Sequence, residues 1–321
     1  MKKIFILLIL SAALQLNLVL AQTNKITFKA PKVYPEGIAF DTRSNIAYVS
    51  SVKTGTIGSV DQQGKYSEIF ADNGLKSTFG MKLDETNNRL WVCAGDPNHS
   101  IYKEPSTFKK MARVVAIDIN SRKKVMDVDL AALSEGNHFP NDLTLDNKGN
   151  LYITDSFSPM IYKVDAAGKA SVWSKNELFK SASIGLNGIA YHPDGFILVA
   201  HNTDGCILKV DINDPAKVEK VNIERFFPGA DGLWIDNKKN LILVQNKGVN
   251  KVFMLSSSDK WKSAKVVGTS PSSELLQNPT TCGWFKNNIY VLNSKINELS
   301  DSSIRPSDEF SFQQVVFKQK Q

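Results

Sequence analysis

The sequence predicts an all-β fold, a six-bladed β-propeller with a central metal site, and three observations support the propeller. Six segments share one plan, in which a special residue is followed by an alternating apolar strand, a turn and a second strand. Four of the five spacings between matching positions lie between 43 and 50 residues, as expected for four-stranded propeller blades. Few stretches have helical periodicity. A pair of β-sandwiches is the alternative architecture, but it would not demand a sixfold repeat.

The first residues have the pattern of a secretory signal peptide. Two lysines precede an apolar run, Ile4–Leu14, and small side chains then offer a cleavage site. A transmembrane anchor is the alternative, but Gln15 and Asn17 interrupt the run before the ~18 apolar residues that a span needs. We expect a signal peptide over residues 1–21 and a propeller domain over residues 22–321. The mature protein should be secreted or periplasmic, with no membrane span after signal cleavage.

The basic residues are scattered along the chain. The formal net charge is +7, and short pairs such as Lys109-Lys110 and Lys123-Lys124 lie next to polar turn residues. A nucleic-acid-binding protein would gather such residues into a stripe with interleaved aromatic side chains. We therefore interpret the excess charge as solvated surface and expect no nucleic-acid partner.

The three cysteines, Cys93, Cys206 and Cys282, lie among apolar or small neighbours and form no CxxC motif. An odd number allows at most one disulfide bond, and the sequence does not decide whether one forms. We interpret all three as small, buried, apolar side chains.

The repeats predict the two inner strands of each blade. They cover residues 35–51, 78–94, 140–156, 186–202, 230–246 and 280–294. Five positions after each special residue a turn begins, at Asp41, Asp84, Asp146, His192, Asp236 and Lys286. We interpret these as turn formers, because Asp, Asn and Gly satisfy or tolerate turn backbone. Further apolar alternation predicts two outer strands per blade, and residues 25–30 or 310–318 could complete the last blade and close the ring.

The special positions should meet on one ring, because the innermost strand of each blade begins at the central channel. The ring residues are Glu36, Phe79, Asn141, Asn187, Asp231 and Thr281. Without a ligand, two carboxylates and two amides facing one point would repel and desolvate one another. A hard cation resolves this, and calcium accepts about 6–8 oxygen ligands of this kind. We predict a site for calcium, or another divalent cation such as magnesium, manganese or zinc, formed by Glu36, Asn141, Asn187 and Asp231.

The ordered motifs carry a family resemblance that spans residues 30–295. The segments "PEGIAFD", "FPNDLTLDNKGNLYITD", "LNGIAYHPDG", "ADGLWID" and "PTTCGW" resemble the superfamily of regucalcin, gluconolactonase and luciferin-regenerating enzyme. Paraoxonase and diisopropyl fluorophosphatase are similar but more distant propellers. The resemblance implies a divalent-metal hydrolase of lactones or, in some relatives, of phosphoesters and phosphofluoridates.

The resemblance also implies roles for individual residues. Glu36, Asn187 and Asp231 match the family's metal ligands. Asn141 matches a position that binds metal, metal-bound water or substrate. Asp231 also matches the family's proposed general base or nucleophile, and Asp142 would support Asn141 from behind.

Several residues near the ring depart from the family pattern. Phe139 stands where the sugar-lactone enzymes usually carry Arg, and Phe79 occupies the second ring position, so we expect a rather apolar pocket. His138 could contact substrate or lie in a solvated loop. Thr281 could hydrogen-bond a ligand water or merely begin a strand. We interpret the polar insert at residues 96–110 as a solvated excursion, with a lid or partner loop as the alternative.

The predicted function is an exported, calcium-dependent hydrolase that opens a small-molecule lactone or related ester, gluconolactonase-like, with Asp231 as the catalytic residue. The alternative is a non-enzymatic propeller that keeps the metal for structure and binds a small ligand or a protein partner. The sequence contains no G-x-S-x-G, H-E-x-x-H or P-loop motif. Asp231 favours the enzyme, because a purely structural site could use another oxygen ligand there.

Overall fold

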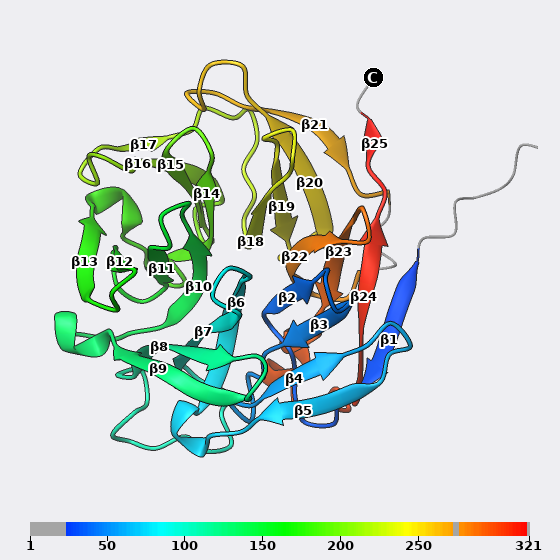
Figure 1. Ribbon diagram of the computed structural model, residues 1–321. Helices are drawn as coiled ribbons and strands as arrows, with labels where there is room; N and C mark the ends of the chain where they lie inside the picture. Colours follow the sequence, from blue (N-terminus) through cyan, green and yellow to red (C-terminus); the bar gives the residue numbers. More distant parts are fainter. Residues whose placement is uncertain (1–23, 272–275, 320–321) are drawn as a thin grey trace, which may run out of the picture.

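Six antiparallel β-sheets surround a central axis in the computed structural model, which confirms the all-β, six-bladed β-propeller (Figure 1). The structure describes residues 24–271 and 276–319. The predicted signal peptide lies outside these residues. Within them, no helix has the length and apolar character needed to cross a membrane.

Each blade runs outward from an innermost strand at the axis. The innermost strands are β2 (Ile38–Asp41), β6 (Ser77–Asp84), β10 (Pro140–Leu145), β14 (Leu186–His192), β18 (Ala230–Ile235) and β22 (Pro279–Phe285). The second strands are β3 (Ile46–Val49), β7 (Arg89–Gly95), β11 (Leu151–Asp155), β15 (Phe196–His201), β19 (Leu241–Gln245) and β23 (Asn288–Asn293).

The outer half of each blade contains the third and fourth strands. The third strands are β4 (Ile57–Val60), β8 (Ala112–Asp118), β12 (Met160–Val164), β16 (Cys206–Asp211), β20 (Lys251–Ser256) and β24 (Glu309–Val315). The fourth strands are β5 (Tyr66–Phe70), β9 (Lys123–Asp129), β13 (Ala170–Lys175), β17 (Val218–Lys220), β21 (Lys265–Thr269) and β1 (Lys25–Lys29), and β25 (Lys318–Gln319) adds a further edge strand to β21. Short 3-10 helices lie in the connections: η1 (Asn73–Leu75), η2 (Ala131–Leu133), η3 (Glu177–Phe179) and η5 (Ile296–Ser300).

The ring is closed by the two ends of the chain, which pair in the last blade. β1 is hydrogen-bonded to β24, and Figure 1 shows them side by side in blue and red. Both candidate closing segments therefore take part, residues 25–30 as the outermost strand and residues 310–318 as the third. Phe28 is buried there, with its ring centroid 6.1 Å from that of Phe310 and 5.0 Å from that of Phe312.

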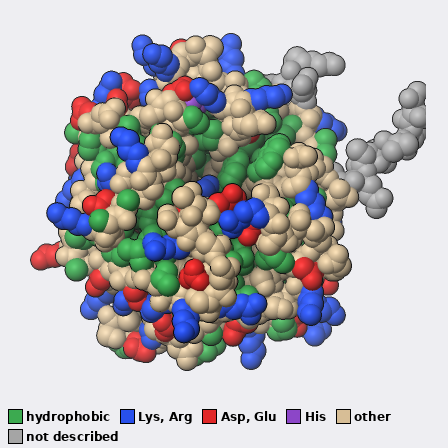
Figure 2. Space-filling view, in the orientation of Figure 1, with side chains coloured by type: hydrophobic (Ala, Val, Ile, Leu, Met, Phe, Trp, Pro, Cys, Tyr) green, Lys and Arg blue, Asp and Glu red, His purple; other side chains and the backbone are tan. Residues whose placement is uncertain are grey.

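The hydrophobic core lies between neighbouring blades, so the inner strands are covered on both faces. In β15, for example, every residue is buried, and its apolar side chains pack toward the blades on either side. All three cysteines are buried and free, as their apolar neighbours predict. On the face shown in Figure 2, Lys and Arg side chains are spread among Asp and Glu rather than gathered into a stripe.

A β-bulge recurs near the start of five innermost strands and decides which side chains reach the axis. At each bulge the register with the second strand shifts across two residues. These pairs are Phe79-Gly80, Asn141-Asp142, Asn187-Gly188, Asp231-Gly232 and Thr280-Thr281. A bulge places two residues opposite one and re-aims a side chain, here turning the first residue of each pair toward the channel.

Glycine at the second bulge position lets neighbouring blades approach closely at the axis. A Cβ atom on Gly188 would overlap the backbone carbonyl oxygen of Asp231 in the next blade. Gly37 lies in the same relation to Phe79, although it precedes β2 rather than lying in a bulge. The close approach narrows the channel and brings the ring side chains together.

Candidate metal centre and active site

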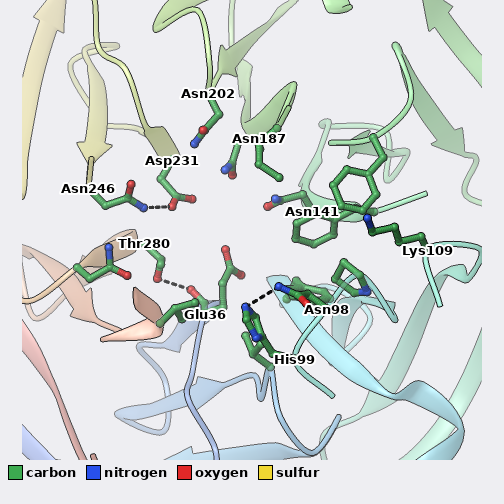
Figure 3. Close-up of a pocket in the computed structure, with 18 of the residues that line it drawn as sticks. Glu36, Asn98, His99, Lys109, Asn141, Asn187, Asn202, Asp231, Asn246 and Thr280 are labelled. Atoms are coloured by element: carbon green, nitrogen blue, oxygen red, sulfur yellow. Dashed lines mark hydrogen bonds between the residues drawn. The ribbon is translucent and has the colours of Figure 1, made fainter. Parts of the chain in front are cut away.

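A cavity of about 400 Å³ opens at the end of the channel where the innermost strands begin. Its floor contains four of the predicted ring residues, Glu36, Asn141, Asn187 and Asp231, which come from four different blades. Figure 3 shows these four side chains directed toward a common space. The structure therefore brings together the residues predicted to bind metal.

Three oxygen atoms on this floor have no hydrogen-bond partner in the described part of the chain. They are Oε2 of Glu36, Oδ1 of Asn141 and Oδ1 of Asn187, and all three are buried. The amide nitrogen of Asn141 donates to Ser156 Oγ at 2.9 Å, which leaves its oxygen for the cavity. Buried acceptors without partners are rare in native proteins, because each costs about 1–3 kcal/mol. The arrangement fits a hard cation bound by carboxylate and amide oxygens.

The carboxyl groups are held where negative charge is disfavoured. Burial, followed by the charges of Asp231 and Asp142, raises the pKa of Glu36 well above its usual value. Burial and the Asp142 charge likewise raise the pKa of Asp231. A cation between them would reverse both effects.

The donor set is poor in charged ligands. Across residues 24–271 and 276–319, no group of three or more His, Cys, Asp and Glu side chains is arranged to hold a metal. The floor has two carboxylates, Glu36 and Asp231, and completes its oxygen set with amides. Amide and carboxylate oxygens suit calcium or magnesium better than soft metals.

Asp231 is held in place by its neighbours. Asn246, which follows β19, donates from its side-chain nitrogen to Asp231 Oδ2 at 2.5 Å. Hydrogen bonds from Asn246, the Asn187 side chain and the Gly232 backbone each act to lower the pKa of Asp231, against the larger effect of burial. The carboxylate thus keeps a fixed orientation at the cavity floor.

Sequence reasoning missed the residues at the ends of the second strands. Asn202 and Asn246 line the cavity, and Ser156 orients Asn141. Each is the last residue of its repeat, as Ser51 and Ser294 are of theirs. This recurrence of Asn or Ser at one repeat position was a signal that could have identified them.

Asp142 lies behind the ring and does not line the cavity. Its carboxylate accepts hydrogen bonds from the backbone nitrogens of Leu143 at 2.8 Å and Ile189 at 3.3 Å. Burial raises the pKa of Asp142 to about 6, although these bonds and the charge of Lys82 act to lower it. Asp142 therefore connects two blades directly behind Asn141 and Asn187.

The structure places Thr280, and not Thr281, at the sixth ring position. Thr280 is buried, lines the cavity and donates to the backbone oxygen of Glu36 at 2.7 Å. The prediction was shifted by one residue because it assumed a turn of the same length in every blade. Here the turn is shorter, and its two residues, Lys286 and Asn287, have φ values of 49° and 62°, as in a two-residue hairpin.

His138 does not line the cavity, and its side chain is buried rather than solvated. It is buried, and its Nδ1 lies 2.8 Å from Asp155 Oδ2 while its Nε2 lies 3.2 Å from the Ser134 backbone oxygen. The hydrogen bond with Asp155 raises the pKa of His138, against the opposing effect of burial. These contacts connect the segment just before β10 to Asp155 in β11 and to Ser134.

One wall of the cavity is aromatic. The rings of Phe79 and Phe139 meet edge to face with centroids 4.6 Å apart, and those of Phe139 and Phe157 with centroids 5.4 Å apart. Phe108 adds a further ring to the lining. Phe79 and Phe139, the two residues that depart from the family pattern, therefore give the cavity an apolar wall, as expected.

The two ends of the insert at residues 96–110 form another wall of the cavity, so the interpretation as a solvated excursion is correct only for its middle, where residues 103–106 are exposed. Pro97, Asn98, His99, Phe108 and Lys109 all line the cavity. The insert is held in place by a hydrogen bond within it and by an ion pair with Lys76, just before β6. Within it, the Thr107 hydroxyl donates to Asp96 Oδ2 at 2.8 Å. From outside, Lys76 Nζ lies 2.6 Å from Glu104 Oε1.

Comparison with known proteins supports the fold. No protein-family model and no curated protein matches the chain. The major allergen Mala s 1 of Malassezia sympodialis superposes with a TM-score of 0.71 at 17% identity, covering 91% of this chain and 96% of that one. A luciferin-regenerating enzyme gives 0.63 at 16% identity (91% and 96% covered), and a gluconolactonase from Xanthomonas campestris gives 0.60 at 13% (92% and 91% covered).

The protein is therefore a six-bladed β-propeller with a ring of carboxylates and amides at one mouth of its channel. Its fold is structurally similar to those of gluconolactonase, luciferin-regenerating enzyme and Mala s 1, at low sequence identity. The same fold serves both hydrolases and a protein described as an allergen, so the activity has to be argued from the site.

Proposed function

We propose that the protein is an exported hydrolase of lactones or related esters that depends on a divalent cation, with calcium favoured. The observation that carries this proposal is the set of buried oxygens without partners on Glu36, Asn141 and Asn187, gathered around Asp231. A purely apolar ligand would leave these atoms unsatisfied, whereas a cation satisfies them together.

Glu36, Asn141, Asn187 and Asp231 would hold the cation. When bound, it would polarise the carbonyl group of a lactone or ester in the cavity. The oriented carboxylate of Asp231 would accept the proton of an attacking water, or attack the carbonyl carbon itself. Asn246 would keep the carboxylate in position, because its amide binds the Oδ2 atom of Asp231.

The cavity favours a substrate with an apolar body. The Phe79, Phe139 and Phe157 rings would cover that body and exclude water from the reacting carbonyl. A hydroxyl-rich sugar lactone would find few hydrogen-bond partners on this wall. A small lactone or ester with an alkyl or aryl substituent suits the site better.

The test is acid release from a panel of alkyl and aryl lactones by the mature protein, with calcium and then with chelator. Asp231→Asn, which keeps the size of the side chain, is measured beside the wild type. Turnover that disappears with chelator and falls at least about 100-fold in D231N supports the proposal. If calcium raises the melting temperature but no lactone or ester is opened, the hydrolase proposal fails and a metal-containing binding protein takes its place.

A further inference from the structure

The cavity has an acidic floor and a basic rim. The insert at residues 96–110 forms one side of the rim, and it brings Lys109 to the edge of the cavity across from Asp231 (Figure 3). The Lys109 ammonium lies 5.3 Å from the ring centroid of Phe108 and 5.7 Å from that of Phe157. A lysine held over aromatic rings in this way keeps its positive charge in a defined place.

Lys109 forms no ion pair in the part of the chain that the structure describes. By contrast, Lys76, which is buried, pairs with Glu104. Of the two acids in the insert, Glu104 pairs with Lys76, and Asp96, whose Oδ2 accepts from Thr107, forms no ion pair with Lys109. The Lys109 ammonium therefore has no carboxylate of the described residues within 4.0 Å.

The surroundings of the insert are electropositive. His99, on the same wall, has a pKa lowered first by burial and then by the charges of Lys103 and Lys53. A neutral imidazole at this point leaves Lys109 as the charged side chain of the insert that lines the cavity. Glu36 and Asp231 face it from the floor, where a bound cation would offset them.

A second hollow adjoins the cavity at Lys109. It has a volume of about 370 Å³, shares Lys109 and Phe157 with the main cavity, and is otherwise lined by Asn137 and small residues of the loop before β14. Ser181 and Ser183 give this hollow a polar surface. A ligand that extends from the floor across Phe157 would reach Lys109 and then this polar hollow.

We propose that the natural substrate is an amphiphilic anion, a lactone or ester whose apolar body ends in a carboxylate that Lys109 binds. This inference rests on the proposed function, because it places the reacting carbonyl at the floor. The aromatic wall packs the apolar body, and the ammonium of Lys109 forms a charge-assisted hydrogen bond with the terminal carboxylate. The basic rim also attracts an anion from solution.

The experiment compares two esters of equal chain length, 4-nitrophenyl hexanoate and the mono-4-nitrophenyl ester of hexanedioic acid, with the calcium-loaded protein. We expect the wild type to prefer the acidic ester, by about 5- to 20-fold in kcat/KM. In Lys109→Met, which keeps an unbranched apolar stem, the ratio of the two kcat/KM values should fall to near one. Sodium chloride should reduce the wild-type preference, because it screens the charge.

Lys110→Met is the matched control, since Lys110 is the next residue, is exposed and does not line the cavity. It should keep the wild-type preference. If the wild type and K109M show the same ratio, Lys109 is only a wall residue and the inference is overturned.

A binding measurement separates this inference from the proposed function. Calorimetry with 6-phenylhexanoate and with 6-phenylhexan-1-ol, in chelator, requires no turnover and no cation. Tighter binding of the acid than of the alcohol, lost in K109M and kept in K110M, supports the inference even if neither ester is hydrolysed. Equal binding of acid and alcohol to the wild type contradicts it, whatever the esters show.

Discussion

At the scale of single residues, Glu36 is a carboxylate in an unfavourable position, because it is buried close to two other acids. The residue is 9% exposed, and its Oε2 atom is buried without a hydrogen-bond partner among the described residues. Because its pKa is raised above the value in an unfolded chain, the charged form opposes folding at neutral pH, and this effect fades as the pH falls.

Glu36→Gln should therefore stabilise the protein in chelator and destabilise it in calcium relative to the wild type. At pH 7.5 without metal, we expect the melting temperature to rise by about 2–4 °C for each kcal/mol of repulsion removed. With excess calcium, the wild type should gain more than E36Q, because the variant has lost one charged ligand. Glu85→Gln, in an exposed turn, is the control for loss of charge alone. If the wild type melts at a higher temperature than E36Q in chelator, the buried charge of Glu36 does not destabilise the fold.

His138 leads to a second prediction about pH, with the same sign as that of Glu36, because both pKa values are raised in the folded protein. Its pKa is raised in the folded protein by Asp155, so its contribution to stability is fully present below about pH 6.5 and is lost as the pH rises through the raised value. We expect His138→Gln to lower the free energy of unfolding by about 1–3 kcal/mol at pH 5.5, and by less at pH 8.5. Denaturant unfolding at both values checks this.

The control for that prediction is His192→Gln. Burial lowers the pKa of His192, so its protonation in acid opposes folding. The wild type should therefore lose its advantage over H192Q toward low pH rather than toward high pH. Parallel pH dependence in H138Q and H192Q would rule out the proposed role of Asp155.

At the scale of elements, the innermost strands determine the site through their bulges. The bulge turns Asn141, Asn187 and Asp231 toward the channel, and the glycine that follows Asn187 or Asp231 lets the next blade approach. The ring geometry is thus a property of strand packing between blades, and a small change in that packing should alter the proposed cation site.

Gly188→Ala tests this link. Its Cβ would overlap the Asp231 carbonyl oxygen, so β14 and β18 must move apart. We expect a loss of about 1–3 kcal/mol in stability and at least tenfold weaker calcium binding. Gly248→Ala is the control, because Gly248 has open space around its Cβ position and only a positive φ of 83°. If G188A and the wild type bind calcium equally well, the geometry of the ring does not depend on the packing between β14 and β18.

The repeat pattern made the fold and four floor residues predictable. Glu36, Asn141, Asn187 and Asp231 occupy equal positions in segments of equal length, so alignment placed them correctly. Thr280 was missed because its strand runs one residue further before a shorter turn. The apolar pattern did not reveal this shift of one residue, because the pattern is the same whether Thr280 or Thr281 is aligned with the other ring residues.

Other parts of the site depend on contacts between distant segments. Lys109 reaches the cavity because Lys76 and Asp96 fasten the insert against blade two, and no periodic signal encodes that packing. The sequence left the role of His138 undecided, because its burial depends on a contact with Asp155 at the end of β11. Local sequence patterns predict strands well and loop placement poorly.

At the scale of the whole molecule, stability depends on the closure between β1 and β24. Without β1, the third strand of the last blade would become an open edge, and Phe310 and Phe312 would lose the packing of Phe28. An open edge is a template for association between chains.

Removing residues 22–30 should therefore lower the melting temperature markedly and cause concentration-dependent association. Thermal unfolding and size-exclusion chromatography at several concentrations check both effects. Removing residues 318–321 is the control, because it deletes only β25 from an edge of the fifth blade. A shortened chain that stays monomeric and melts like the wild type would show that closure contributes little.

The closure also sets an order of events during synthesis. Lys25 pairs with Gln313, so the first strand to leave the ribosome waits for one of the last. At about 5–20 residues per second, that wait is roughly 15–60 s. Throughout it the last blade is unfinished, and contacts across such a sequence separation form slowly. For a chain that we propose to be exported, this delay keeps the polypeptide open to translocation. Protease sensitivity of chains stalled before and after Glu309–Val315 would reveal the step.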